Sequence, residues 1–318
     1  MMKNLACWLL LIYSGLLSAA ETYPPAEVTM QLRQLGANSY YVMGAPGIAT
    51  DNAGFISNAG FVITPEGVVV IDGLGTPSLA WKLRELIRSL TDKPVIKVLV
   101  THYHADHIYG LQVYQDEGAE IIAPAGVYAY LDAPNALSRL EERRVSLYPW
   151  VNEQTRLVKP DRVIEQDSEL ELGGVRLQLI YLGAAHSDGD MAVFVEPDGV
   201  MFTGDIIFEG RLPFVGDADS KRWLATLEAM SQRQLKGLVP GHGPAARNPA
   251  LALSKTRDYL ALLRQSMGAA VAEMTEFAEA YDTVDWSAFS QLPAFTETNR
   301  RNAYQVYLAM EREAMAAE

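Results

Sequence analysis

An apolar run that leads directly into three histidines constrains this chain more than any other feature. Residues Val95–Thr101 are typical of a strand buried on both faces, as in a parallel sheet covered by helices. Other strand-like runs, such as Val175–Tyr181 and Met191–Val195, alternate with helical stretches such as Pro77–Leu90 and Lys221–Leu235. This alternation, without a repeat or a low-complexity linker, predicts α/β layers within one domain.

The first twenty residues predict an export signal. Lys3 precedes the apolar run Leu5–Leu17, which is followed by the small residues Ser18-Ala19-Ala20. The run is shorter than the roughly 20 residues that span a bilayer. We therefore expect residues 1–20 to be a signal peptide and residues 21–318 a single domain. The mature protein would be periplasmic or secreted, with no membrane attachment.

Composition excludes several kinds of function. The only cysteine, Cys7, lies within the predicted signal, so the mature chain has no thiol for catalysis, metal ligation or a disulfide. The formal net charge is −13, from 26 basic and 39 acidic residues, which gives no general attraction to nucleic acid or anionic membranes. We expect a small-molecule substrate and no nucleic-acid partner. The sequence does not indicate an oligomeric state.

All five histidines follow predicted strands, where α/β proteins place ligand sites. They lie in Thr101-His-Tyr-His-Ala-Asp-His107, Gly183-Ala-Ala-His186-Ser-Asp-Gly189 and Val239-Pro-Gly-His242-Gly-Pro244. In a turning segment His102 and His104 suit one metal, whereas Asp106 and His107 point to a neighbouring position. Imidazole and carboxylate ligands suit Zn²⁺, and other divalent metals can also use them. The alternative is a polar loop with incidental histidines, but three of the five fall within six residues.

These motifs, in this order and with a Thr-Gly-Asp that ends at Asp205, resemble the metallo-β-lactamase superfamily over about Asn58–Pro244. The resemblance implies an αββα sandwich with a two-metal site at one edge of the sheets, followed by a helical part at residues 250–318. It implies two sets of zinc ligands and a bridging residue: His102, His104 and His186; Asp106, His107 and His242; and Asp205 between the metals.

The implied chemistry is hydrolysis. Two metals would lower the pKa of a shared water towards about 7. The resulting metal-bridging hydroxide would attack the substrate, and Asp106 would orient the water or carry its proton. Thioesters, lactones, β-lactams and phosphoesters all fit this mechanism. We expect a secreted hydrolase with two zinc ions that cleaves a small ester-like bond, such as a thioester or lactone.

Departures from particular subfamilies leave alternatives open. Asp205 stands where β-lactamases have cysteine or serine, and the following residues lack the lysine or serines that hold the drug's carboxylate. The aspartate is similar to glyoxalase II-like thioesterases, although Gly-Pro after His242 departs from their pattern. Residues 205–220 and 299–303 resemble secreted metallohydrolases associated with quinoprotein and sulfur-oxidation systems. An iron-dependent persulfide dioxygenase and a non-catalytic metal-binding protein are further alternatives, which the seven ligands for two metals disfavour.

Three further groups of residues are candidates for supporting roles. Asp72 ends a core strand and is expected to accept the second N–H of a metal-bound histidine, with an N-cap or turn role as the alternative. Arg211 is a candidate for binding a substrate anion, unless it is solvated or paired with Glu209. Several aromatic residues could wall an apolar pocket or pack in the core: Tyr103, Tyr148, Trp150, Phe208 and Phe214.

Overall fold

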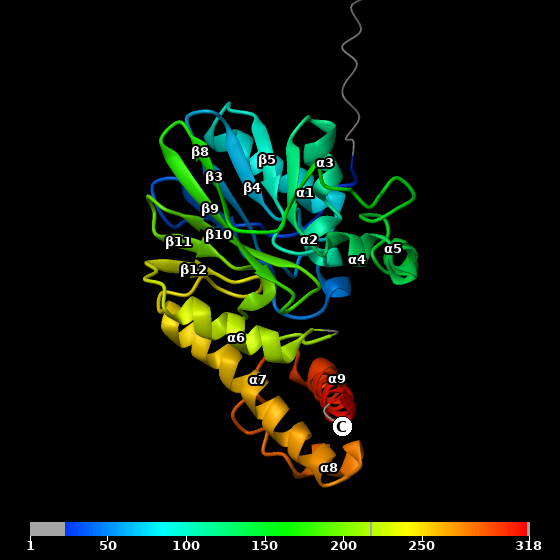
Figure 1. The fold of residues 1–318 in the computed structure, drawn as a ribbon. Helices are drawn as coiled ribbons and strands as arrows, with labels where there is room; N and C mark the ends of the chain where they lie inside the picture. The colour runs from blue at the N-terminus through cyan, green and yellow to red at the C-terminus, as the bar shows by residue number, and fades with distance from the viewer. Residues whose placement is uncertain (1–22, 217, 317–318) are drawn as a thin grey trace, which may run out of the picture.

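Two β-sheets packed face to face form the centre of the fold (Figure 1). The computed structural model describes residues 23–216 and 218–316. The predicted signal peptide at residues 1–20 therefore lies outside the described residues. Among the residues that are described, none of the helices has the length and hydropathy of a membrane span.

The larger sheet combines antiparallel and parallel strands. Its order is β1 (Leu32–Gln34), β2 (Ser39–Val42), β3 (Ala59–Ile63), β4 (Val68–Ile71), β5 (Val95–Leu99), β6 (Glu120–Pro124) and β7 (Arg162–Ile164). Strands β1 to β4 pair in antiparallel fashion, and β4 to β7 pair in parallel. The buried parallel strand predicted from the apolar run is β5, which ends two residues earlier than expected.

Three strands of the smaller sheet end at the same edge. Its order is β12 (Gly237–Val239), β11 (Val200–Phe202), β10 (Asp190–Val195), β9 (Val175–Gly183) and β8 (Ser168–Leu172). Strands β8 to β11 are antiparallel, whereas β11 and β12 are parallel. Because β10 runs opposite to both of its neighbours, β9, β11 and β12 share one direction and end at the same edge.

Strand β4 shows why its residues form an uninterrupted apolar run. Val69 and Ile71 face the core between the two sheets, together with Leu177 of the smaller sheet. Val68 and Val70 belong to a second core, beneath the helices. Successive side chains of a strand point to opposite faces, so a strand in the middle of a layered structure must be apolar at every position.

Helices cover the outer face of each sheet. They are α1 (Pro77–Leu90), α2 (Ala105–Ile108), α3 (Leu111–Asp116), α4 (Val127–Leu131), α5 (Pro134–Ser146), α6 (Ser220–Ser231), α7 (Pro249–Ala272), α8 (Phe277–Thr283) and α9 (Phe295–Ala316), with the short 3₁₀ turns η1 (Ala49–Asp51) and η2 (Gly204–Ile206). Leu79 and Leu83 of α1 pack in the core of the larger sheet. Trp223 and Leu227 of α6 pack on the smaller sheet. The αββα sandwich with a helical C-terminal part is thus confirmed.

Helix α1 matches its predicted limits because both ends carry local signals. The Oγ1 atom of Thr76 accepts a hydrogen bond from the backbone N–H of Leu79 at 3.2 Å, and Pro77 occupies the first turn.

Two other predicted helices have different limits. The one expected from about Ile108 begins at Ala105 and is interrupted at Gly110, where a Cβ would lie 2.0 Å from the carbonyl oxygen of Gly73.

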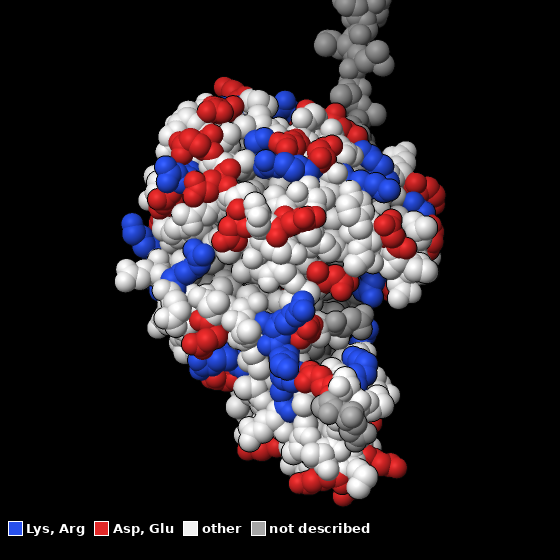
Figure 2. All heavy atoms as spheres, viewed as in Figure 1, with Lys and Arg blue, Asp and Glu red and all other residues white. Residues whose placement is uncertain are grey.

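The helical stretch predicted at residues 126–147 consists of two helices, α4 and α5. Pro134 begins the second helix, because proline suits a first turn and cannot continue a helix from its preceding turn. Helices α7 to α9 form the extension drawn in yellow to red in Figure 1. Figure 2 shows acidic and basic side chains near one another over both the sandwich and these helices, so charge alone does not locate the functional site.

Candidate metal centre

The predicted ligands gather at one edge of the sandwich. His102 and His104 lie in the loop after β5, and Asp106 and His107 lie in α2, which follows that loop. Three further residues follow strands that end at this edge of the smaller sheet: His186 after β9, Asp205 in η2 after β11, and His242 after β12. Both sheets therefore contribute side chains.

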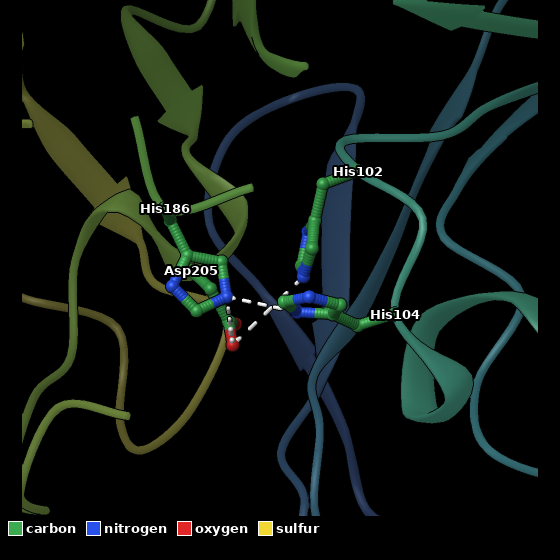
Figure 3. A group of neighbouring side chains, drawn as sticks. All are labelled: His102, His104, His186 and Asp205. Atoms are coloured by element: carbon green, nitrogen blue, oxygen red, sulfur yellow. Dashed lines mark hydrogen bonds and ion pairs between the residues drawn. The ribbon is translucent and has the colours of Figure 1, made fainter. Parts of the chain in front are cut away.

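The first group of ligand atoms contains three histidines and Asp205 (Figure 3). The Nε2 atom of His186 lies 3.0 Å from Nδ1 of His104 and 3.4 Å from Oδ2 of Asp205. The Nε2 atom of His102 lies 3.9 Å from the same carboxylate oxygen. All four ligand atoms lie within 4.8 Å of one another, a spacing that allows them to bind one cation.

The second group contains Asp106, His107 and His242. Oδ2 of Asp106 lies 3.3 Å from Nε2 of His242 and 3.7 Å from Nε2 of His107. Asp205 reaches this group as well, because its Oδ1 is 3.2 Å from His107 Nε2 and its Oδ2 is 3.4 Å from His242 Nε2. The Asp205 carboxylate therefore lies between the two groups.

Buried hydrogen bonds orient the rings of the second group. Oδ2 of Asp72 lies 2.9 Å from Nδ1 of His107, and the backbone carbonyl of Ile56 lies 2.7 Å from Nδ1 of His242. These acceptors hold a proton on Nδ1 and direct Nε2 towards the ligand group, which is the usual orientation of a metal-binding histidine. The hydrogen bond expected between Asp72 and a candidate ligand histidine is thus present.

A second chain of hydrogen bonds links Asp72 to the first group. Thr101 donates to Asp72 through its backbone N–H at 2.7 Å and through its hydroxyl at 2.8 Å. The Thr101 oxygen in turn lies 3.1 Å from Nδ1 of His102. One buried carboxylate therefore supports a ring in each group.

The donor atoms fit divalent cations. His102 Nε2, His107 Nε2 and Asp205 Oδ1 are buried and have no hydrogen-bond partner within the described part of the chain. Buried polar atoms without partners are destabilising, and a cation would satisfy these. The seven residues offer only nitrogen and oxygen, a set that suits zinc and also other transition metals.

Protonation differs between the two groups. Burial lowers the pKa of His102 well below its ordinary value and that of His186 to about 3, so both rings are neutral. Although burial also lowers the pKa of His107, the charges of Asp205 and Asp106 outweigh this effect and raise it. The second group thus concentrates negative charge, which favours a cation.

The loop that carries His186 is held by two residues that the sequence did not single out. The carboxylate of Asp190 accepts hydrogen bonds from the backbone N–H groups of Ala185 and Ser187, at 3.1 and 2.9 Å. The Trp223 ring lies against His186, with ring centroids 5.0 Å apart. A Ser-Asp-Gly-Asp stretch after the histidine is the local signal that could have predicted this turn.

The loop that carries His242 requires glycine and a distant asparagine. A Cβ on Gly241 would lie 1.8 Å from Oδ1 of Asp205, so only glycine fits beside this carboxylate. The side chain of Asn58 donates to the carbonyls of Pro240 at 2.7 Å and Gly243 at 2.8 Å. The two glycines of the Pro-Gly-His-Gly motif are thus explained by close approach of the backbone to Asp205 and Glu209.

A cavity of about 470 Å³ opens onto both ligand groups. Arg211 lines it, and its Nη1 atom lies 3.4 Å from Nδ1 of His242. Of the aromatic candidates, Tyr103, Phe208 and Phe214 line the cavity. Tyr148 and Trp150 are not among the lining residues: Tyr148 is 66% exposed, and Trp150 donates to the carbonyl of Pro25.

The stretch Asn299-Arg-Arg-Asn302 holds one wall of the cavity. Asn302 accepts a hydrogen bond from the backbone N–H of Val215 at 3.0 Å and donates to the carbonyl of Pro213 at 2.7 Å. Tyr259 of α7 donates to Asn299 at 2.8 Å. Asn302 thus attaches α9 to the segment that contains Phe214, and Asn299 attaches α9 to α7, so the C-terminal helices contribute to the shape of the site.

Comparison with known proteins agrees with this geometry. The family model described as "Metallo-beta-lactamase superfamily" matches residues 52–242. A metallo-beta-lactamase type 2 from Bacillus sp. (strain 170) is 22% identical over 192 residues, which cover 59% of this chain and 66% of that protein. The chain thus matches slightly less than two thirds of that relative's length.

Solved structures show the same fold. A metallo-beta-lactamase from Pontibacter korlensis superposes with a TM-score of 0.57 at 20% identity, over 73% of this chain and 99% of that one. The inverting sec-alkylsulfatase Pisa1 from Pseudomonas sp. superposes with a TM-score of 0.69 at 19% identity, over 88% of this chain and 50% of that one.

Proposed function

The chain belongs to the metallo-beta-lactamase superfamily of metal-dependent hydrolases, and we propose that it is secreted, holds two zinc ions and cleaves an ester-like bond in a small molecule. One observation carries the two-metal proposal. Asp205 lies within 3.2 to 3.4 Å of histidine nitrogens from both ligand groups. A carboxylate in this position suits a bridge between two cations.

Each cation has its own ligands in this proposal. One would be bound by His102 Nε2, His104 Nδ1 and His186 Nε2, the other by Asp106 Oδ2, His107 Nε2 and His242 Nε2, with Asp205 shared. Two zinc ions bound there would lower the pKa of a shared water and polarise the bond to be cleaved. The Asp72 carboxylate keeps the ring of His107 in its ligating form.

Asp106 is the residue that we propose to move the proton. Its side chain is 23% exposed, against 5% for Asp205, so it is the more accessible of the two carboxylates. Burial raises the pKa of Asp106, but the charge of His107 and the hydrogen bond with His242 lower it further, so the carboxylate is ionised. The ionised carboxylate can accept a hydrogen bond from the attacking water, and we propose that it orients this water or carries its proton to the leaving group.

The cavity supports a small substrate. Its volume of about 470 Å³ falls in the range of sites for small molecules. Thioesters and lactones are the substrates that we favour, and β-lactams are an alternative. The departures around Asp205 and His242 argue against close similarity to either the lactamases or the glutathione thioesterases.

Sulfate esters are a second candidate, favoured by one observation. The alkylsulfatase structure covers 88% of this chain, whereas the lactamase structure covers 73%. A coverage of 88% must include part of the C-terminal helices, because the residues before them make up a smaller share of the chain. Those helices hold one wall of the cavity through Asn299 and Asn302. A sulfate ester is also an ester-like bond that two cations can polarise.

Metal analysis and a substrate panel together test the proposal. Freshly purified, chelator-free protein should contain close to two zinc ions per chain. It should turn over at least one of nitrocefin, a γ-lactone, an acyl thioester and an alkyl sulfate. Less than one metal ion per chain would contradict the proposal. Oxygen consumption with glutathione persulfide by iron-loaded protein would instead support the dioxygenase alternative.

Export is tested separately. We propose that residues 1–20 direct secretion and are removed. N-terminal sequencing of the protein recovered from the periplasm or medium should begin at Glu21. Recovery of the full-length chain from the cytoplasm alone would contradict this part of the proposal without affecting the metal site.

A further inference from the structure

The cavity that contains the metal ligands is also lined by three tyrosines and four arginines, namely Tyr103, Tyr109, Tyr130, Arg139, Arg143, Arg211 and Arg301. Tyr109 follows α2, Tyr130 lies on α4, and Arg139 and Arg143 lie one helical turn apart on α5. These four residues are called the phenol–arginine wall below. None of them belongs to the metal ligands, and the proposed hydrolysis does not use them.

The hydroxyl groups of the two tyrosines have unused hydrogen-bonding capacity. Both oxygen atoms are buried and lie beside each other, and neither has a hydrogen bond of normal geometry to any other group within residues 23–216 and 218–316. Tyr109 as a whole is only 1% exposed. A phenol is protonated at neutral pH, so at least one of the two hydroxyl protons remains available to a ligand. Such groups are costly without an acceptor, and a ligand in the cavity can supply one.

The two arginines are also without partners. Neither guanidinium makes an ion pair or a hydrogen bond to a described side chain or backbone group, although Glu141 lies on the same helix. Arg144 is the contrast, because it pairs with Glu141 and donates to the carbonyls of Asn152 and Thr155. Both arginines lie close enough to the two phenols for their charges to act on them.

Every polar group of this wall is a hydrogen-bond donor, and two of them are cationic. The complementary ligand is therefore an acceptor that carries negative charge. The acidic residues that face the same cavity are the ligands Asp106 and Asp205, together with Asp188. The first two would be neutralised by the proposed cations, which leaves Asp188 as the one other carboxylate among the described lining residues.

We infer that the phenol–arginine wall binds an oxyanion on the substrate, a carboxylate or a sulfate, while the bond to be cleaved lies at the metal ligands. The same cavity is also lined by apolar side chains, among them Ile48, Val127, Leu147 and Phe214. The substrate class is thus a small ester with an apolar chain and an anionic end. This inference rests on the proposed function and narrows its substrate.

Matched esters test the inference. Mono-4-nitrophenyl adipate, suberate and sebacate differ from 4-nitrophenyl hexanoate, octanoate and decanoate in having a carboxylate in place of the terminal methyl group. Wild-type protein should prefer the anionic ester by about tenfold in kcat/KM at one or more chain lengths. Arg139→Gln should reduce this preference about tenfold, and Tyr130→Phe about threefold. Arg88→Gln, an exposed arginine of α1 outside this cavity, is the matched control and should retain it.

A binding measurement separates this inference from the proposed function. Octanoate should bind wild-type protein about tenfold more tightly than octanamide in calorimetry, and Arg139→Gln should reduce the difference. If wild type hydrolyses no ester, the proposed function fails, but octanoate binding still decides the inference. If wild type and Arg139→Gln preferred octanoate over octanamide to the same extent, the inference would be overturned. Loss of the preference in Arg211→Gln alone would also overturn it, because the anion would then bind to Arg211, which is not part of the phenol–arginine wall.

Discussion

Replacing Asp72 with asparagine alters a single atom of the carboxylate that supports both ligand groups. Oδ2 of Asp72 accepts hydrogen bonds from His107 Nδ1 at 2.9 Å and from the Thr101 hydroxyl at 2.8 Å. Oδ1 accepts from the backbone N–H of Thr101 at 2.7 Å. Asp72 has φ +63°, a conformation that asparagine also adopts, so the backbone should not change.

The expected loss follows from the direction of these hydrogen bonds. If the asparagine oxygen accepts the hydrogen bond from the Thr101 N–H, the asparagine NH₂ group faces two other donors, the Thr101 hydroxyl and His107 Nδ1. His107 can restore a hydrogen bond only by moving its proton to Nε2, which removes the lone pair from the ligand atom. Loss of such a supporting partner lowers metal affinity about 10–100-fold. We expect metal affinity at the second group to fall about 100-fold, or about 2.7 kcal/mol. The loss of affinity at the first group should be smaller, because His102 depends on Asp72 only through Thr101.

Competition against a chromophoric chelator, with metal content measured in parallel, provides the assay. Asp198→Asn is the matched control, because Asp198 is also a buried carboxylate that accepts backbone hydrogen bonds, from Ala37 and Asn38, but lies outside both ligand groups. It should lower the Tm yet keep both metal ions. Wild-type metal affinity in Asp72→Asn would refute the argument from the ring proton. Equal metal loss in both variants would indicate general unfolding.

Three further predictions concern the same centre. Asp205→Ala should lower metal content and activity together, because this carboxylate contacts both groups, and unchanged activity would mean that the site is wrongly assigned. Gly241→Ala should lower the Tm by about 3–10 °C and reduce metal content, since its Cβ would lie 1.8 Å from Asp205 Oδ1. Gly237→Ala, whose nearest contact would be an ordinary 3.6 Å, should leave both unchanged. Removal of metal with a chelator should lower the Tm, and zinc should restore it; a Tm independent of zinc would contradict a metal bound to the native state.

The positions of the candidate ligands could be predicted because their signals are local. Each histidine follows a strand within a few residues, and the directions of the strands bring these loops to one edge. Strand β8 was missed although exposed Glu169 and Glu171 alternate with buried Leu170 and Leu172, a pattern that predicts a strand. The missed strands β1 and β7 are three residues long, too short for such a pattern.

The residues that support the site could not be predicted, because their partners are distant in the sequence. Asn58 holds the loop of His242 across more than 180 residues. Trp223 packs against His186 from a helix on the outer face of the smaller sheet. Tyr130 showed no motif at all, and its unused hydroxyl group became evident only when the cavity was known. Such contacts depend on the packing of whole layers.

The first ligand group takes His102 and His104 from the larger sheet and His186 and Asp205 from the smaller one. Neither sheet alone offers a complete set of donors, so a cation can be captured only after the two sheets have met. A chain that is exported before it folds would therefore leave the cell without metal and take it up on the far side of the membrane. The zinc available in that compartment, rather than in the cytoplasm, would then determine how much active enzyme forms.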